Sequence, residues 1–273
     1  MKFHFSFVVL LFTLVACSHA PTEGGRRSIA SLDISSTFVP IHAGSFDMGS
    51  DENEYGRTMM ETRHHVSITH DFEMQATPVT QIQFKRVMSM NPSFTHHKSE
   101  CPENYEEKTF CCTTNPVESV SWYQVQNFIT AMNQKHDGYV YRLPTSAEWE
   151  YAARAGSSST FFFGDDVDEL GKYSWYFENS RQRTHPVASK RPNAWGLYDM
   201  AGNVRNWVAD LPPEYTADAL IDPVGALKSD NHEIRGCSWS NFSTECRSGA
   251  RFSDTSDTAS SATGFRLVRT KAP

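Results

Sequence analysis

The sequence predicts a single α+β domain with long irregular connections. Short runs of alternating apolar residues predict strands near 38–48 and 65–72, and again near 233–239 and 264–269. Three segments that begin with a capping box and continue with apolar residues at helical spacing predict helices. Gly, Pro, Ser and Asn recur between these elements, so we expect the connections to be irregular loops.

The first predicted strands lie in 38–48, as an interrupted pair with a glycine turn between its halves. A charged loop follows, and 65–72 alternates again as a strand. The tandem pair His64 and His65 invites interpretation as a metal site. No third ligand stands at a recognisable spacing from this pair, so histidines on the surface of a strand are the favoured interpretation.

The three predicted helices each start at a hydroxyl residue followed three positions later by Glu or Gln. The pairs are Thr80 with Gln83, Ser121 with Gln124, and Thr145 with Glu148. Gly156 stands where the glycine after the third helix belongs. The segment 89–119 holds no periodic pattern and is long for a loop, which indicates either a functional or a disordered segment.

Length and charge restrict the function classes. A chain of 273 residues is long enough for one large domain or two small ones, and its sequence shows no linker that would split the domain. The formal net charge is −7, with acidic and basic residues well mixed. A protein that binds nucleic acid would need a basic face, so we expect no nucleic-acid partner.

The N-terminus has the features of a targeting segment. Lys2 supplies a positive start, and the apolar run 5–16 has the length of a signal-peptide core. Residues 14–17, Leu-Val-Ala-Cys, resemble a bacterial lipobox, which implies a signal peptide over 1–16 and lipidation of Cys17. The alternative is an ordinary secretory signal cleaved after Ala16 or Ala20.

A lipobox implies anchoring of the chain to a membrane. Acyl chains contribute roughly 0.8 kcal/mol per buried CH₂, so three of them are ample for stable anchoring. Ser18 follows the lipobox cysteine, and no Asp stands there to signal inner-membrane retention. We therefore expect an outer-membrane lipoprotein, facing the periplasm or the cell surface, with 17–35 as a tether.

Export places the remaining cysteines in an oxidising compartment, which favours disulfides. The candidates are Cys101, Cys111, Cys112, Cys237 and Cys246. An odd count leaves at least one of them without a partner in the chain. Cys101 can bridge to either of its two neighbours in the same polar loop, and Cys237 can bridge to Cys246.

The stretch 196–210, GLYDMAGNVRNWVAD, fits neither helix nor strand periodicity in its first half. Gly196 and Gly202 permit backbone angles that other residues resist. Its closely spaced Asp and Asn residues suit either a tight turn, in which they bond local backbone groups, or a hard cation such as Ca²⁺.

This stretch resembles the G-L-Y-D-M-x-G-N-V-W-E-W block of the formylglycine-generating enzyme family, also called sulfatase-modifying factors. Further blocks match that family in order. They are PIHAGSFDMGSDENE (40–54), PVTQIQF (78–84), PVESVSW (116–122), YRLPTSAEWEYAARAG (141–156), RGCSWSN (235–241) and GFRLVR (264–269). The resemblance implies one domain over 36–270, with a C-type-lectin-like α+β fold of low regular secondary structure.

Active members of that family oxidise a sulfatase cysteine to formylglycine with oxygen and copper. The metal is held by two cysteines five residues apart, because copper(I) prefers soft thiolates. Here the second cysteine position falls on Cys246 and the first on Asn241, while Cys237 replaces a glycine of the motif. If the chain were active, its catalytic candidates would be Cys246, Ser238 and Cys237.

The resemblance also implies one calcium site. By the family's pattern, its ligands are the side chains of Asp199 and Asn206 and the carbonyls of Gly202 and Val204. Asn206 stands where the family commonly has Glu, which keeps an oxygen but removes a charge. We therefore expect modest affinity.

Three function classes remain open. The leading one is a non-catalytic binding or assembly module whose partner is a protein or a surface ligand. The second is an oxidoreductase, either a copper-dependent formylglycine-generating oxidase or a related oxidase. The third is a diversified surface receptor, because some such receptors share this fold. Variable loops on a rigid scaffold suit binding, and this supports the first class.

Overall fold

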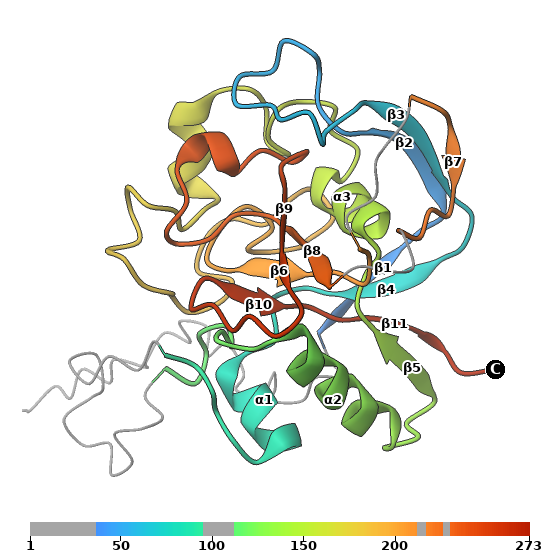
Figure 1. Ribbon diagram of the computed structural model, residues 1–273, viewed down its shortest axis with the longest axis vertical. Coiled ribbons are helices and arrows are strands. Elements are labelled where there is room, and N and C mark those ends of the chain that lie inside the picture. The colour runs from blue at the N-terminus through green and yellow to red at the C-terminus, as the bar shows by residue number, and fades with distance from the viewer. Residues whose placement is uncertain (1–36, 95–111, 212–216, 226–229) are drawn as a thin grey trace, which may run out of the picture.

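The computed structural model describes residues 37–94, 112–211, 217–225 and 230–273 (Figure 1). Short strands, three α-helices and long loops make up these residues, and the predicted α+β class is confirmed. Within these ranges, no helix is both long and apolar enough to cross a membrane. The signal peptide, the tether and Cys17 lie outside the described residues.

The strands form three small sheets. The first has the order β1-β4-β11-β5, with β1 at Phe38–Ile41, β4 at Phe72–Gln75, β11 at Val268–Lys271 and β5 at Tyr139–Arg142. The second has the order β10-β6-β8-β9, with β10 at Thr263–Phe265, β6 at Arg205–Trp207, β8 at Asn231–Arg235 and β9 at Arg251–Thr255. The third has the order β2-β3-β7, with β2 at Gly44–Met48, β3 at His64–Ile68 and β7 at Leu220–Ile221.

The predicted strand pair in 38–48 exists as two strands, but they do not pair with each other. Val39 of β1 lies opposite Met74 of β4, whereas Phe46 of β2 lies opposite Val66 of β3. Alternation of apolar residues fixes which side chains face the core. It does not fix the partner strand, so the prediction of adjacent strands is wrong here.

The three helices begin as predicted, and each capping box is formed in full. They are α1 at Gln81–Met88, α2 at Trp122–Asn133 and α3 at Ser146–Arg154. Gly156 takes a φ of +90° just after α3, which is the backbone conformation that glycine adopts at low cost. In the described loops, short 3-10 helices lie at Val167–Lys172 and Ser243–Glu245.

Two hydrophobic clusters hold the sheets and helices together. In the first, α1 and α2 pack with Tyr141, Trp207 and Phe265. In the second, Trp149 and its neighbours on α3 pack against β1 to β4. Figure 1 shows α1 and α2 side by side on one side of β11, with α3 on the other. The helices are thus divided between the two faces of the central strands.

The C-terminal third differs from its prediction. The strand expected over 233–239 ends at Arg235, because Gly236 takes a φ of +77° and turns the chain. Between the two strands expected in this part of the chain lies β9, which pairs with β8. Ending the strand early releases residues after Gly236 to form the loop that carries the candidate site.

Candidate functional site

The stretch 196–210 starts as a series of turns and ends in β6. Gly196 and Gly202 have φ values of +85° and +151°, and Asp199 and Asn203 also take left-handed conformations at +54° and +69°. A Cβ at Gly202 would lie 2.7 Å from the carbonyl oxygen of Trp175. The glycine there is required both by its backbone angle and by this close approach.

Asn203 joins two loops that are far apart in the sequence. Its backbone N–H donates to the Trp175 carbonyl at 2.8 Å, and its own carbonyl accepts the Trp239 N–H at 3.0 Å. Its side-chain amide exchanges two hydrogen bonds with the backbone of His185, at 2.9 and 3.0 Å. The turn therefore fixes the loop over 174–189 next to the loop over 236–246.

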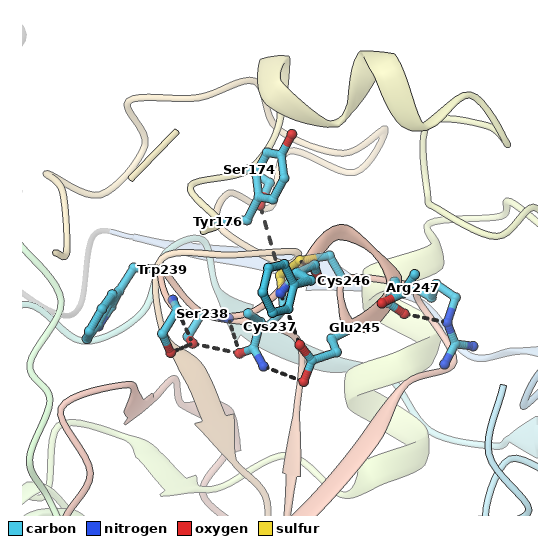
Figure 2. The surroundings of a disulfide bond; sticks show 12 residues. Ser174, Tyr176, Cys237, Ser238, Trp239, Glu245, Cys246 and Arg247 are labelled. Atoms are coloured by element: carbon cyan, nitrogen blue, oxygen red, sulfur yellow. Dashed lines mark hydrogen bonds between the residues drawn. A yellow bond between two sulfur atoms is a disulfide. The ribbon is translucent and has the colours of Figure 1, made fainter. Parts of the chain in front are cut away.

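The loop over 236–246 is closed by a disulfide between Cys237 and Cys246 (Figure 2). Their sulfurs are 2.03 Å apart, and both residues are buried against Phe161, Leu170 and Tyr176. This is the pairing that the export argument favours for these two residues. A sulfur in a disulfide carries no thiolate charge, so Cys246 is not a thiolate ligand in this state.

Asn241, at the first cysteine position of the family motif, is held by three hydrogen bonds of its side chain. Its Oδ1 accepts from the backbone N–H of Ser238 at 3.0 Å and from the Ser238 hydroxyl at 2.6 Å. Its Nδ2 donates to Glu245 Oε1 at 2.7 Å. Figure 2 shows Ser238 and Glu245, the partners of Asn241, beside the disulfide, with Trp239 directed away from it.

The residues at this position do not fit a copper site of the two-thiolate kind. Copper(I) binding there requires two soft thiolates. The first position offers a hard amide oxygen that already accepts two hydrogen bonds, and the second is a disulfide sulfur. Ser238 is buried, and its hydroxyl is used by Asn241 and Ser240.

Asp199, the charged member of the predicted calcium site, is buried and bonded within the chain. Its Oδ2 accepts from the Ala188 N–H at 2.8 Å, and its Oδ1 accepts from the Asn203 amide at 3.3 Å. Burial raises the pKa of this carboxyl, while those hydrogen bonds and the nearby charge of Arg266 act to lower it.

The side-chain oxygen of Asn206, the predicted calcium ligand, is already engaged in hydrogen bonds within the chain. Its Oδ1 accepts from Arg266 Nε at 2.8 Å and from Trp149 Nε1 at 3.2 Å. Both partners are donors only, so the amide cannot be turned over. Its Nδ2 then donates to the Val204 carbonyl at 3.2 Å. Two of the four predicted calcium ligands are thus bonded to each other.

The buried Arg266 completes this network. Its guanidinium also donates to the carbonyls of Tyr198, at 2.8 Å, and Asp199, at 3.2 Å. Burial lowers the pKa of Arg266 to about 10, a value at which it stays charged at neutral pH. The orientation of Asn206 therefore does not fit a cation bound by all four predicted groups, because an arginine bonds the same stretch of backbone.

The remaining predicted site residues lie elsewhere. Cys112 is buried, and Cys101 and Cys111 lie outside the described residues, so pairing among these three stays a prediction. Among the described residues, no group of three or more His, Cys, Asp or Glu side chains is placed to hold a metal ion. His65 pairs with Asp47 at 3.1 Å on the surface of β3.

A pair of exposed aromatic rings beside the site was not predicted from the sequence. Phe177 and Phe242 lie with ring centroids 4.8 Å apart, and they are 43% and 55% exposed. The Phe177 N–H donates to the Asn241 carbonyl at 2.9 Å, which ties the pair to the disulfide loop. The two residues come from different loops, so no local pattern in the sequence could have paired them.

Comparison with known proteins agrees with the family resemblance found in the sequence. A model of the sulfatase-modifying factor enzyme 1-like domain matches residues 31–271. The formylglycine-generating enzyme of Streptomyces coelicolor is 34% identical over 171 residues, which are 56% of this chain and 52% of that enzyme. The chain thus matches about half the length of this relative.

Two further proteins are similar over more of their length. The chaperone protein LppX of Paenibacillus barcinonensis is 30% identical, over 73% of this chain and 79% of LppX. The structure of Treponema denticola variable protein 1 superposes with a TM-score of 0.74 and 27% identity. The match covers 85% of this chain and 94% of that one.

The fold and the site together define an α+β protein with the fold of formylglycine-generating enzymes, in which the resemblance to the family motif puts Asn241 at the first cysteine position. The chain belongs to the sulfatase-modifying factor family, since the family's domain model matches nearly all of its described residues. The family resemblance and the formylglycine-generating-enzyme fold expected from the sequence are thereby confirmed.

Proposed function

We propose that this chain is a non-catalytic member of the family, which acts as a binding or assembly module on an outer-membrane lipoprotein. The observation that carries the proposal is the disulfide between Cys237 and Cys246, together with Asn241 at the first cysteine position. A two-thiolate metal site needs two reduced cysteines. What remains is a rigid scaffold with surface loops, which suits binding.

Two other functions compete with this proposal. The similarity to the Streptomyces enzyme favours a copper-dependent formylglycine-generating oxidase or a related oxidoreductase. The similarity to the Treponema variable protein favours a surface receptor with diversified loops. The altered cysteine positions weigh against the first. A chaperone among the relatives at 30% identity supports partner binding.

The experiment that tests the non-catalytic proposal is a peptide map under non-reducing conditions. Protein from the native compartment is alkylated without reductant, digested and analysed by mass spectrometry. We expect one peptide pair linked through Cys237 and Cys246, and no alkylation of either residue. Alkylated Cys246 in most molecules would contradict the proposal, because an available thiol is what the oxidase requires.

Lipid anchoring at Cys17 is a separate part of the proposal. It is motivated by the residues 14–17 after an apolar run. Intact-mass spectrometry of membrane-extracted protein should show an acylated N-terminal cysteine, and Cys17→Ser should release the chain from the membrane fraction. A soluble wild-type product that begins after Ala20 would contradict anchoring.

A further inference from the structure

A cavity lies between the loop that connects β2 to β3, residues 49–63, and the end of α3. Its volume is about 180 Å³, and Phe46 and Tyr151, whose rings are in contact, form part of its wall. Pockets for small-molecule ligands are larger, at roughly 300–1,000 Å³. The cavity therefore suits one long side chain of a partner better than a whole ligand.

The mouth of this cavity is acidic. Asp47 and Asp51 line it and share one arginine, since the guanidinium of Arg63 lies 3.0 Å from the first carboxylate and 3.6 Å from the second. Two carboxylates against one guanidinium leave one negative charge. His65 lies 3.1 Å from Asp47 and adds a positive charge only when it is protonated.

The inner side of the loop has the same shortage of cations. Glu54 lines the cavity and shares Arg247 with Glu61, at 2.7 Å from each. Four carboxylates thus share two arginines, which leaves an excess of two negative charges. One of these remains even when His65 is protonated, so the sign does not depend on that histidine. Charge complementarity therefore favours a cationic occupant.

The arginine on the floor of the cavity does not reverse this sign. Arg154 is buried, and its three nitrogens donate to Glu150 and to the carbonyls of Ser159 and Gly49. Its charge belongs to a buried network of three arginines and three carboxylates. The members are Arg154, Arg235, Arg251, Glu150, Glu233 and, through Ser146, Asp210.

The lining favours an organic cation over a metal ion. In the part of the chain that the structure describes, no three acidic side chains are grouped to hold a metal. A guanidinium stacks on aromatic rings such as those of Phe46 and Tyr151, and it bonds carboxylates through pairs of N–H groups. Its aliphatic stem packs on apolar walls. An arginine side chain therefore matches both the rings and the acidic mouth.

The loop is held in place before any partner binds. Arg247, which directly follows Cys246 of the disulfide, donates to the Gly56 carbonyl at 2.7 Å. Arg251 donates to the Met60 carbonyl at 2.6 Å. Ordering a loop on binding costs affinity, and these bonds between the loop and the body of the domain reduce that cost.

The same loop carries exposed apolar side chains beside the cavity. Tyr55 and Met59 are 84% and 91% exposed, and Tyr55 directly follows Glu54 of the cavity lining. Aromatic residues and methionine are enriched in protein interfaces. Figure 1 shows this loop in blue at the top of the molecule.

We propose that the 49–63 loop docks a partner protein, which inserts one arginine side chain into the cavity beside Asp51 and Glu54 and covers Tyr55 and Met59. The proposal rests on the binding-module function and names the partner as a protein with an exposed arginine flanked by apolar residues. The formal net charge of −7 attracts such a basic surface.

A matched pair of small probes tests the cavity. The mature protein, held in a neutral detergent, is titrated with N-acetyl-arginine amide and with N-acetyl-citrulline amide, which has the same shape without the charge. Protein NMR follows the backbone amides of Gly156 and Ser158, which line the cavity. We expect the arginine probe to saturate with a Kd of about 5 mM or tighter, and the citrulline probe to bind at least about tenfold more weakly.

Three variants locate the binding. Asp51→Asn removes a charge at the mouth and Ser158→Lys adds a competing cation, so each should weaken the arginine probe about fivefold or more. Glu52→Gln is the control, because it makes the same change of charge on the same exposed loop but does not line the cavity. At physiological salt it should leave the Kd within about twofold.

A longer probe tests the apolar rim. The tripeptide N-acetyl-Phe-Arg-Phe-amide should bind at least about threefold more tightly than the single arginine, because its rings can cover exposed apolar side chains. Met59→Ser should remove this gain and leave the Kd of the single arginine probe within about twofold. Equal affinity of the two probes would assign the cavity to a small free cation and overturn the docking of a protein.

Three results would overturn the cavity itself: no saturation, equal affinity for arginine and citrulline, or wild-type affinity in both Asp51→Asn and Ser158→Lys. None of these outcomes changes the peptide map of Cys237 and Cys246, so the docking site and the non-catalytic function fail separately.

Discussion

The amide of Asn241 donates a hydrogen bond to the carboxylate of Glu245, with 2.7 Å between Nδ2 and Oε1. In the family's active members a metal-binding thiolate stands at the position of Asn241. Here the side chain at this position stabilises the conformation of the loop, because Oδ1 of Asn241 also accepts two hydrogen bonds from Ser238. Relative to the family motif, the loop thus has internal hydrogen bonds in exchange for a metal ligand.

This exchange should be reversible by substitution. The double variant Cys237→Ser/Asn241→Cys frees Cys246 from its disulfide and restores two cysteines five residues apart. We expect it to bind one copper(I) ion in a competition titration against a chromophoric chelator, because copper(I) prefers thiolates. Wild type should bind none at this position.

Cys237→Ser/Asn241→Ser is the matched control, since it frees Cys246 but adds no second thiol. We expect its copper(I) affinity to be lower than that of the restored pair by at least about tenfold. If the control binds as tightly as the double cysteine variant, the missing thiol at Asn241 does not explain the loss of the metal site.

The disulfide should contribute measurably to stability. Cys237 and Cys246 close a loop with a sequence separation of 9. In the chain-entropy model, a loop of this length stabilises by about 2–3 kcal/mol. Cys237→Ala/Cys246→Ala should lose at least that free energy of unfolding in urea titrations, and wild type treated with reductant should lose a similar amount. A loss below about 0.5 kcal/mol would indicate that the bond does not form.

Calcium should have little effect on the stability of wild type. Asn206 bonds Arg266 and Val204, so two of the four expected ligands are already satisfied within the chain. We expect melting temperatures in EDTA and in millimolar calcium to agree within about 1 °C, since a ligand stabilises only in proportion to its binding. A clear rise with calcium that Asp199→Ala removes would establish the calcium site instead.

Asp210 should make stability depend on pH. Burial raises the pKa of this carboxyl from 3.8 to about 6, and the charges of Glu233 and Glu148 add to the shift, while hydrogen bonds from the backbone of Gly225 and Ser146 oppose it. The folded state therefore holds a proton that the unfolded state releases between about pH 4 and pH 6. Its stabilising effect is complete below pH 4 and is lost as pH rises through 6.

The variant Asp210→Asn is neutral at every pH and isolates this effect. From pH 4 to pH 7, wild type should lose about 2.4 kcal/mol of unfolding free energy relative to the variant. Carboxyls with lowered pKa values, such as Glu148, act in the opposite direction in both proteins and cancel in the difference. Urea titrations of both proteins at several pH values in this range measure the difference in unfolding free energy. A difference that does not change with pH would contradict the raised pKa of Asp210.

Much of the fold could be predicted from local patterns. Each capping box placed a helix start at the correct residue, because the box is formed by groups three positions apart. The alternating pattern in 38–48 revealed both strands but not their partners, which lie in other parts of the chain. Strand pairing depends on long-range packing that no local window contains.

The candidate site also has features that the local sequence predicts and features that depend on residues far away in the chain. The closing disulfide followed from the spacing of Cys237 and Cys246 and from the expectation that the chain is exported. The role of Asn206 did not, because its orientation is set by Arg266 and Trp149, which are 60 and 57 residues away in sequence. The contact between Phe177 and Phe242 also escaped prediction, since the two rings come from loops that only the folded chain brings together.

The central claim is that the chain does not generate formylglycine, and a turnover assay tests it most directly. Copper-treated protein is incubated in air with a peptide carrying the C-x-P-x-R motif, and the peptide is analysed by mass spectrometry. We expect no loss of the peptide thiol beyond that seen with protein-free buffer. Turnover that survives Asn241→Ala but vanishes in Cys237→Ser would contradict the account, because it would show that Cys237 and Cys246 form a working thiol pair.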